Sequence, residues 1–250
     1  MHGKNSLTFY ENKGIMQIIT TSDGSHTLYL PEIDEQYHSV NGAITESEYV
    51  YLDKGFNYFP GKNPKVFEVG FGTGLNCLLT ALQAEKSQRP TNYFSIEKYP
   101  LEKKIIKELN YGSLISLEAQ NVFSRIHECK WNKLVNISEY FNLHKIKGDL
   151  IDIDLCTFEN CDVIYFDAFA PDKQPELWTQ QIFRKIYSAT SPGGILVTYS
   201  AKGEVRRQLA ACGYEMERLP GPPGKNEMLR GIKKFGKDLI AKKLHYIRTL

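Results

Sequence analysis

The spacing of apolar side chains changes near Pro64, which divides the chain into two parts. Before Pro64 short alternating runs predominate, whereas after it strand-like and helix-like runs follow one another repeatedly. No internal repeat or low-complexity linker interrupts either part. We therefore expect residues 1–63 to form an N-terminal extension that packs on a domain formed by residues 64–250.

The extension is predicted to contain a hairpin and a helix. Residues 15–30 alternate in polarity around Ser22-Asp23-Gly24-Ser25, which is typical of two antiparallel strands with Asp-Gly at the bend. Residues 46–52 have helical spacing after the turn signal Asn41-Gly42, and Thr45 is the expected N-cap.

The second part alternates strands with helices. Strands are predicted at residues 65–70, 91–100, 141–149, 161–169 and 195–200. Helices are predicted at residues 75–86, 101–110, 175–190 and 205–214, and residues 113–135 are helical without clear boundaries. Tyr111-Gly112 is expected to close one helix, and Pro192-Gly193-Gly194 to lead the chain into the last of these strands.

This order of elements predicts an α/β fold with a doubly wound, mostly parallel sheet. Right-handed crossovers place helices on both faces of such a sheet. Gly213 is expected to stop the last helix, and residues 214–234 then contain two short strands around a Pro/Gly loop. We expect them to form a terminal antiparallel hairpin.

The composition is that of an ordinary globular protein. The chain has 250 residues, of which 42% are hydrophobic and 24% charged, which excludes disordered and collagen-like classes. The longest uncharged stretch, residues 69–84, is too short to span a membrane, and the first residues lack a signal-peptide core. Five cysteines without a CxxC pair and six histidines without ligand spacing predict a cytoplasmic protein without a metal site.

Charge is unevenly distributed although the formal net charge is only +2. Residues 225–250 contain eight Lys or Arg against Glu227 and Asp238, so residues 1–224 carry an acidic excess. This basic tract, expected to lie next to the binding crevice, either contacts phosphates, with Phe235 and Tyr246 available for stacking, or is a solvated extension.

Three alternate glycines, Gly70, Gly72 and Gly74, lie where the first core strand turns into a helix. Such glycines allow positive φ and close approach to a ligand, and the helix start offers free N–H groups. The alternative is a tight structural turn. The preceding Glu68 would repel a diphosphate but would hold a cationic amine, which favours S-adenosyl-L-methionine (SAM) over a dinucleotide.

Acidic residues end the next two strands. Glu97 is placed to accept hydrogen bonds from both ribose hydroxyls, unless it is only a solvated strand end. Gly148-Asp149 follows the third strand and either meets the adenine edge or, through Asp149, caps a turn.

Asp167 ends a central strand and precedes Ala168-Phe169-Ala170-Pro171. Because it stands at the carboxyl end of a central strand, it is expected to face the same crevice as the glycine loop. A purely structural role is disfavoured because a buried charge without a partner is costly, although Asp also caps turns. Methyl transfer to an amine needs a neutral, aligned acceptor, which Asp167 would orient while it offsets the developing charge. Phe169 would wall the site or stack on a base, or else pack in the core.

Several segments resemble one known family, the methyltransferase domain of the MnmC tRNA wobble-uridine modification enzymes. They are GFGTGLN, SIEKYPL, YFDAFAPDKQPELWTQQIF, SPGGILVTYSAKGEVRRQLAACGY, GKNEMLRG and, in the extension, YHSVNGAITESEYVY. The DAFAP and GKNEML segments are specific, whereas many methyltransferases share the glycine loop. The resemblance covers nearly the whole chain.

The resemblance implies a class I SAM-dependent methyltransferase that converts 5-aminomethyl-2-thiouridine to 5-methylaminomethyl-2-thiouridine at the tRNA wobble position. It puts Glu68, Gly70, Gly72 and Gly74 at the SAM methionine, Glu97 and Lys98 at the ribose, Gly148 and Asp149 near adenine, and Asp167 at the methyl group and amine. Tyr37, Glu46, Phe71, Asn76, Ala168 and Phe169 complete the expected cofactor site. Lys225, Arg206 and Arg207 are candidate tRNA contacts, or else solvated cations.

The family often fuses this domain to a flavin-dependent oxidase. No second dinucleotide fingerprint precedes Leu250, so the chain resembles a stand-alone form without FAD, which acts on the anticodon arm of tRNA and depends on another enzyme for its aminomethyl substrate. One alternative is a polyamine aminopropyltransferase, which would use decarboxylated SAM and a diamine. The other is a non-catalytic SAM- or tRNA-binding module, against which Asp167 argues.

Overall fold

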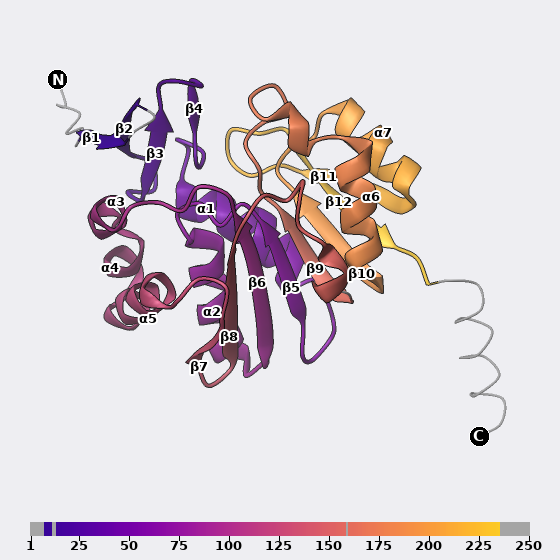
Figure 1. The fold of residues 1–250 in the computed structure, drawn as a ribbon, viewed down its shortest axis with the longest axis horizontal. Coiled ribbons are helices and arrows are strands. Elements are labelled where there is room, and N and C mark those ends of the chain that lie inside the picture. The colour runs from indigo at the N-terminus through magenta and orange to yellow at the C-terminus, as the bar shows by residue number, and fades with distance from the viewer. Residues whose placement is uncertain (1–7, 12–13, 159, 236–250) are drawn as a thin grey trace.

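Two β-sheets organise the molecule, for which a computed structural model describes residues 8–11, 14–158 and 160–235 (Figure 1). The larger sheet has the order β11-β12-β10-β9-β5-β6-β8-β7. Its parallel strands are β5 (Lys65–Val69), β6 (Thr91–Glu97), β8 (Phe141–Lys147), β9 (Cys161–Phe166) and β10 (Thr190–Thr198). The antiparallel strands are β7 (Leu134–Ser138), β11 (Tyr214–Pro220) and β12 (Glu227–Lys233). The predicted α/β fold and its terminal hairpin are confirmed.

Helices cover both faces of this sheet because its strands alternate two sets of apolar side chains (Figure 1). Val163 and Tyr165 of β9 pack in the cluster with α2 (Leu75–Ser87) and α5 (Leu117–Glu128). Ile164 and Phe166 pack in the other cluster, with α6 (Gln180–Ala189) and α7 (Gly203–Cys212). The strand ends between these layers are left open for a site.

Four predictions of boundaries and turns in the main domain were wrong. The helix expected at 101–110 is shorter, as α3 (Lys103–Glu108), and Tyr111-Gly112 begins α4 (Tyr111–Ile115) instead of closing it. A Cβ on Gly112 would lie 2.5 Å from the Gln120 backbone, so this glycine permits α4 and α5 to touch. The expected 175–190 helix is a 3-10 turn (Pro175–Leu177) followed by α6. Pro192-Gly193-Gly194 is a bulge inside β10, not a turn before it.

The extension forms the smaller antiparallel sheet, of β1 (Thr8–Glu11), β2 (Gly14–Thr20), β3 (His26–Leu30) and β4 (Glu35–Gln36). The predicted hairpin is confirmed as β2 and β3. The helix begins earlier than expected, as α1 (Ala43–Ser47), and continues as the π-helix Glu48–Phe56, which packs on β9 and β10. This packing fixes the extension beside the main sheet.

Asp23 caps α1 from the hairpin bend, so the expected N-cap role of Thr45 was wrong. The Asp23 carboxylate accepts the backbone N–H of Thr45 at 2.9 Å and the Thr45 hydroxyl at 2.8 Å. It also accepts the N–H of Ser25 at 3.0 Å. Partial burial alone would raise the pKa of Asp23, but these hydrogen bonds hold it well below its usual range.

We expect Asp23→Asn to lower the free energy of unfolding by about 1–3 kcal/mol, because an amide nitrogen would then face backbone donors. Urea denaturation of wild type and variant measures the difference. The deficit should be full near pH 7 and fade below about pH 4, because the stabilisation from a lowered folded-state pKa is lost on acidification. Asp53→Asn is the control, since exposed Asp53 accepts only a 3.4 Å bond from Asn57. An equal loss in both variants would contradict the assignment.

Candidate functional site

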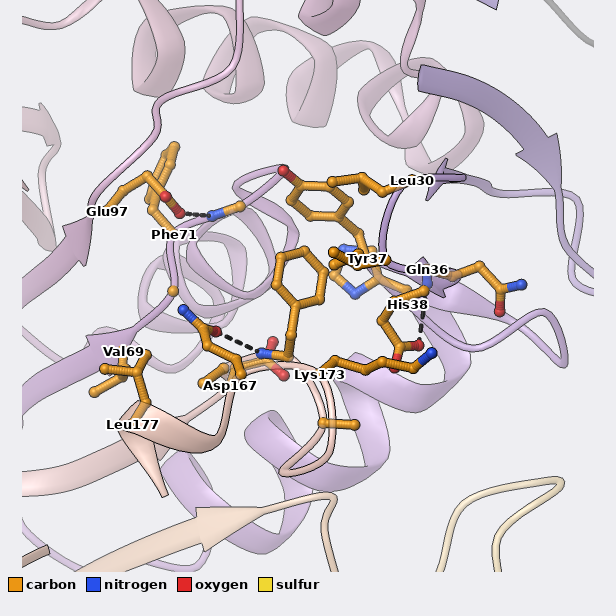
Figure 2. Close-up of a pocket in the computed structure, with 18 of the residues that line it drawn as sticks. Leu30, Gln36, Tyr37, His38, Val69, Phe71, Glu97, Asp167, Lys173 and Leu177 are labelled. Atoms are coloured by element: carbon orange, nitrogen blue, oxygen red, sulfur yellow. Dashed lines mark hydrogen bonds between the residues drawn. The ribbon is translucent and has the colours of Figure 1, made fainter. Parts of the chain in front are cut away.

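A cavity of about 520 Å³ lies where the carboxyl ends of β5, β6 and β9 face the small N-terminal sheet. Figure 2 shows Val69 and Leu177 on the side of the main sheet, and Tyr37 and His38 on the side of the extension, with Asp167 between them. Most of the predicted site residues line this cavity: Tyr37, Glu46, Gly70, Phe71, Gly72, Asn76, Glu97, Lys98, Gly148, Asp149, Asp167, Ala168, Phe169 and Lys225. Its size suits a small-molecule site.

The glycine loop is shaped by close approach as well as by backbone conformation. Gly70 has φ +88°, and a Cβ there would lie 2.6 Å from the carbonyl oxygen of Asp167. Gly72 has φ +50°, and a Cβ on this residue would lie 3.1 Å from the Cδ1 atom of the Tyr37 ring. Gly74 has φ +76° and precedes α2, but it does not line the cavity. The loop is therefore both a tight turn and one wall of the cavity.

The two acidic residues expected at the ribose and at the adenine, Glu97 and Asp149, both line the cavity. Glu97 accepts the N–H of Gly72 at 3.0 Å and that of Tyr99 at 2.8 Å, and its burial raises its pKa (Figure 2). Asp149 pairs with Lys98 at 2.6 Å and accepts the N–H of Ile151 at 2.9 Å. Asp149 thus caps a turn, as one alternative had it, while it also lines the cavity.

Asp167 is held in place by two side chains. The Tyr51 hydroxyl donates to Oδ1, and the Asn76 amide donates to Oδ2 at 2.7 Å. Burial raises the pKa of Asp167 to about 7, although the hydrogen bonds from Tyr51 and Asn76 oppose the shift. A carboxylate with this pKa is suited to hydrogen-bond a cationic amine or to accept its proton near neutral pH.

Glu68 does not line the cavity, so the placement does not support the expected direct contact with a cofactor amine. It is completely buried, where it accepts the Ser95 hydroxyl at 2.6 Å and the Asn76 amide at 3.1 Å. Burial raises the pKa of Glu68 to about 8. Because Asn76 donates to both Glu68 and Asp167, Glu68 acts through Asn76 to orient Asp167.

Aromatic side chains close the cavity on the side of the extension. The rings of Tyr37 and Phe169 meet edge to face, with centroids 5.1 Å apart. The N–H of Phe169 donates to Gln174 at 3.2 Å, which holds the DAFAP loop. Phe169 therefore walls the cavity, one of the predicted roles.

The predicted tRNA contacts are separated in the structure. Lys225 lines the cavity and pairs with Glu46 at 2.5 Å, whereas Arg206 and Arg207 lie exposed on α7 and do not line it.

Within its described part, the basic tract meets the crevice at Lys225, as expected, but not beyond it. β12 runs antiparallel to β10 and leads away from the cavity, so Lys233 reaches the carbonyls of Tyr187 and Thr190 beside the start of β10 (Figure 1). Phe235 lies near Gly193, in the bulge of that strand. The rest of the tract, residues 236–250 with Tyr246, lies outside the described residues.

Two residues at the site were missed by sequence reasoning. Tyr51 and Tyr199 both contact the Asp167 loop, the second by donating to the Ala168 carbonyl at 2.9 Å. Tyr51 is the last residue of segment 37–51, which resembles the family. The resemblance drew attention to this segment but not to the side chain of Tyr51. Its role depends on the π-helix packing on β9, which local spacing does not predict.

Within residues 8–11, 14–158 and 160–235, no helix is long and apolar enough to cross a bilayer. In the same described ranges, no three His, Cys, Asp or Glu side chains are grouped for a metal ion.

The residues present fit SAM. Asn76 Oδ1 is buried at the cavity without a hydrogen-bond partner, so an acceptor is available for an ammonium group. The Glu97 carboxylate accepts the backbone N–H groups of Gly72 and Tyr99, and it retains capacity for a further bond because its two oxygens together can accept about four. A Cβ on Gly148 would have nothing within 4 Å, which leaves space on the adenine side.

Comparisons with known proteins agree with this arrangement. A family model described as S-adenosyl-L-methionine-dependent methyltransferase matches residues 112–234. The tRNA 5-methylaminomethyl-2-thiouridine biosynthesis bifunctional protein MnmC of Cupriavidus necator is 32% identical over 215 residues, which are 80% of this chain and 32% of that protein. Its counterpart in Cupriavidus metallidurans is 31% identical over 229 residues, 84% of this chain and 33% of that protein. The chain thus spans about a third of the length of the curated relatives it matches.

Solved structures show the same fold. MnmC2 from Aquifex aeolicus superposes with a TM-score of 0.71 at 24% identity, over 95% of this chain and 77% of that one. Spermidine synthase from Thermotoga maritima superposes with a TM-score of 0.57 at 13% identity, over 95% of this chain and 76% of that one. At these identities the likeness concerns the fold alone.

Proposed function

Because the chain belongs to a family of SAM-dependent methyltransferases, we propose that it methylates the primary amine of 5-aminomethyl-2-thiouridine at the wobble position of tRNA. The observation that carries the proposal is the half-buried Asp167, fixed by Tyr51 and Asn76 at the wall of a cavity of about 520 Å³. The nucleoside is that named for the MnmC relatives.

The cofactor would be held at three points. Asn76 Oδ1 and the glycine loop receive the methionine part, Glu97 the ribose, and the open side of Gly148 the adenine. When bound, SAM supplies an electrophilic methyl group on its sulfonium. The protein contributes alignment of the acceptor and exclusion of water by Tyr37 and Phe169.

Asp167 would act on the acceptor amine. The amine arrives as a cation and attacks only when neutral, so a carboxylate beside it is needed to take up the proton. Tyr51 and Asn76 keep the Asp167 oxygens in one orientation, which limits the reorganisation needed as the N–C bond forms.

Glu97→Ala is expected to weaken SAM binding on the order of tenfold or more, because hydrogen bonds to ribose are lost and the Gly72 N–H loses its acceptor. Isothermal titration calorimetry of the purified protein measures it. Glu102→Ala is the matched control, since Glu102 is exposed and pairs only with Lys104 on the surface. Unchanged affinity in Glu97→Ala would remove Glu97 from the cofactor site.

The tRNA partner would meet the cavity mouth with its anticodon arm. Lys225, which lines the cavity, is the candidate phosphate contact, while the contribution of Arg206 and Arg207 stays a prediction. A tRNA substrate places the reaction in the cytoplasm. Since the substrate already carries a free aminomethyl group, a preceding reaction must unmask this amine.

The test is transfer of a radiolabelled methyl group from SAM to tRNA that lacks only the final methyl. We expect label in the wobble nucleoside as 5-methylaminomethyl-2-thiouridine, identified by mass spectrometry. Tested in parallel with decarboxylated SAM, putrescine should remain unmodified. Aminopropylation of putrescine with tRNA inert would replace the proposal by an aminopropyltransferase.

A further inference from the structure

Lys225 reaches from the β11–β12 loop into the cavity and binds there as a cation. Its Nζ lies 2.5 Å from Glu46 Oε2 and 4.0 Å from the centroid of the Tyr199 ring. A carboxylate together with an aromatic face is a recognised arrangement for an ammonium group. The protein therefore contains a cation site that is filled by its own side chain.

This cation site adjoins Asp167. The Tyr199 hydroxyl donates to the carbonyl of Ala168, the residue after Asp167, which fixes the ring beside the catalytic loop. Glu46 raises the pKa of Asp167 and Lys225 lowers it, as expected for charges that share one cavity. An ammonium held at Glu46 and Tyr199 would thus stand near the proposed proton acceptor.

Glu46 is more buried than the carboxylates of Glu97 and Asp149, which also line the cavity, and it is held differently. Glu97 accepts the backbone N–H groups of Gly72 and Tyr99, and Asp149 pairs with Lys98. Glu46 is held by one backbone N–H, from Ser39 at 3.1 Å, and by Lys225. Its side chain is only 9% exposed, so it needs a cation to compensate its burial.

We propose that Glu46 and Tyr199 form the subsite for the ammonium group of the acceptor, and that Lys225 fills this subsite until the acceptor displaces it. The inference rests on the proposed amine substrate. It replaces the expectation that Glu46 belongs to the cofactor site. The acceptor would bind as a cation between Glu46 and Tyr199, and would pass its proton to Asp167 before methyl transfer.

Displacement of Lys225 requires only a side-chain movement. Its side chain is 31% exposed, and its long stem can turn toward solvent while the loop stays closed by the hydrogen bond from its N–H to Pro222 O at 2.9 Å. The electrostatic free energy of the exchange should be close to zero, because one ammonium group replaces another beside the Glu46 carboxylate. The released cation would then stand at the cavity mouth, where the phosphates of the RNA are expected.

Benzylammonium is a suitable probe because it carries an aminomethyl group on an aromatic ring and has no phosphate. We expect Lys225→Met to bind it about tenfold more tightly than wild type at pH 8, as measured by calorimetry, because the internal competitor is gone. Adding Glu46→Gln to Lys225→Met should remove this gain. Benzyl alcohol, which is neutral and of similar shape, should bind all three proteins equally weakly.

Arg218→Met is the matched control, since it removes a cation from the same hairpin that pairs with Glu227 at the surface. It should bind benzylammonium as wild type does. Equal affinity in wild type and Lys225→Met would overturn the inference, as would a gain that persists without the Glu46 carboxylate. Thermal denaturation of each variant establishes that the proteins compared are folded.

The outcome is separable from that of the proposed function, because probe binding needs no methyl transfer. Tight, Glu46-dependent binding without methylation of tRNA would support the subsite and reject the nucleoside. Methylation of tRNA without Glu46-dependent binding of benzylammonium would support the nucleoside and reject the subsite.

Discussion

Asp167→Asn is expected to lower kcat for methyl transfer at least tenfold, and on the order of a hundredfold, while SAM affinity changes by less than about threefold. The side chain keeps its shape and its bond from Tyr51 but loses the charge that would receive the amine proton. Single-turnover rates and calorimetry on the same preparation measure the two quantities. Equal losses in rate and in SAM affinity would reassign Asp167 to the cofactor site.

Asp172→Asn provides the control for this substitution. Asp172 lies on the same loop but is exposed, with its carboxylate 2.7 Å from Lys202. It should retain wild-type turnover. Unchanged function in Asp167→Asn would instead favour a non-catalytic binding module.

The pH dependence of Asp167 gives two further readouts of the same variant. With a folded-state pKa of about 7, the wild-type rate should rise with pH to a plateau above 7, and this limb should be absent in Asp167→Asn. Stability has the opposite slope: a carboxyl that binds its proton more tightly when folded destabilises the fold as pH rises from about 4 to 7. Urea denaturation should show this decline in wild type and less of it in the variant.

The sequence located Asp167 and the glycine loop because their positions follow from general rules. In a parallel sheet the carboxyl ends of all strands share one edge, so residues that end predicted strands must meet there. Gly70, Glu97, Asp149 and Asp167 could be assigned to one cavity on this ground, and the structure brings them together. Strand identity and chain order were sufficient for this part.

Side-chain partners across the fold were beyond such rules. Tyr51 meets Asp167 across 116 residues, and no local pattern encodes that distance. The direction of Glu68 was likewise undetermined, since its burial depends on Ser95 and Asn76 arriving from other segments. The course of the basic tract after Lys225 was not predicted, because it follows from β12 lying antiparallel to β10, between β10 and β11.

Substitution of two glycines of the cavity should give the other large effects, one on stability and one on SAM binding. A side chain at Gly70 would clash with the backbone, whereas a side chain at Gly148 would fill open space. Gly70→Ala should lower the free energy of unfolding by about 3–5 kcal/mol, since a Cβ would be strained at φ +88° and would lie 2.6 Å from a backbone oxygen of Asp167. The atoms nearest to this Cβ belong to the backbone of Asp167 and Ala168, and no flexible side chain can move aside. The chain segments that follow β5 and β9 would therefore have to move apart. Urea denaturation measures the loss.

Gly148→Leu should have the opposite profile. A Cβ at Gly148 meets nothing within 4 Å and the position has no positive φ, so unfolding should change by less than about 1 kcal/mol. The leucine would enter the space assigned to adenine and should weaken SAM binding about tenfold or more. A stable Gly148→Leu variant with wild-type affinity would contradict the assignment of this space to adenine. A stable Gly70→Ala variant would show that the backbone after β5 and β9 can relax to admit a Cβ. Loss of stability at Gly70 together with loss of affinity at Gly148 would mean that the first glycine serves the fold and the second the ligand.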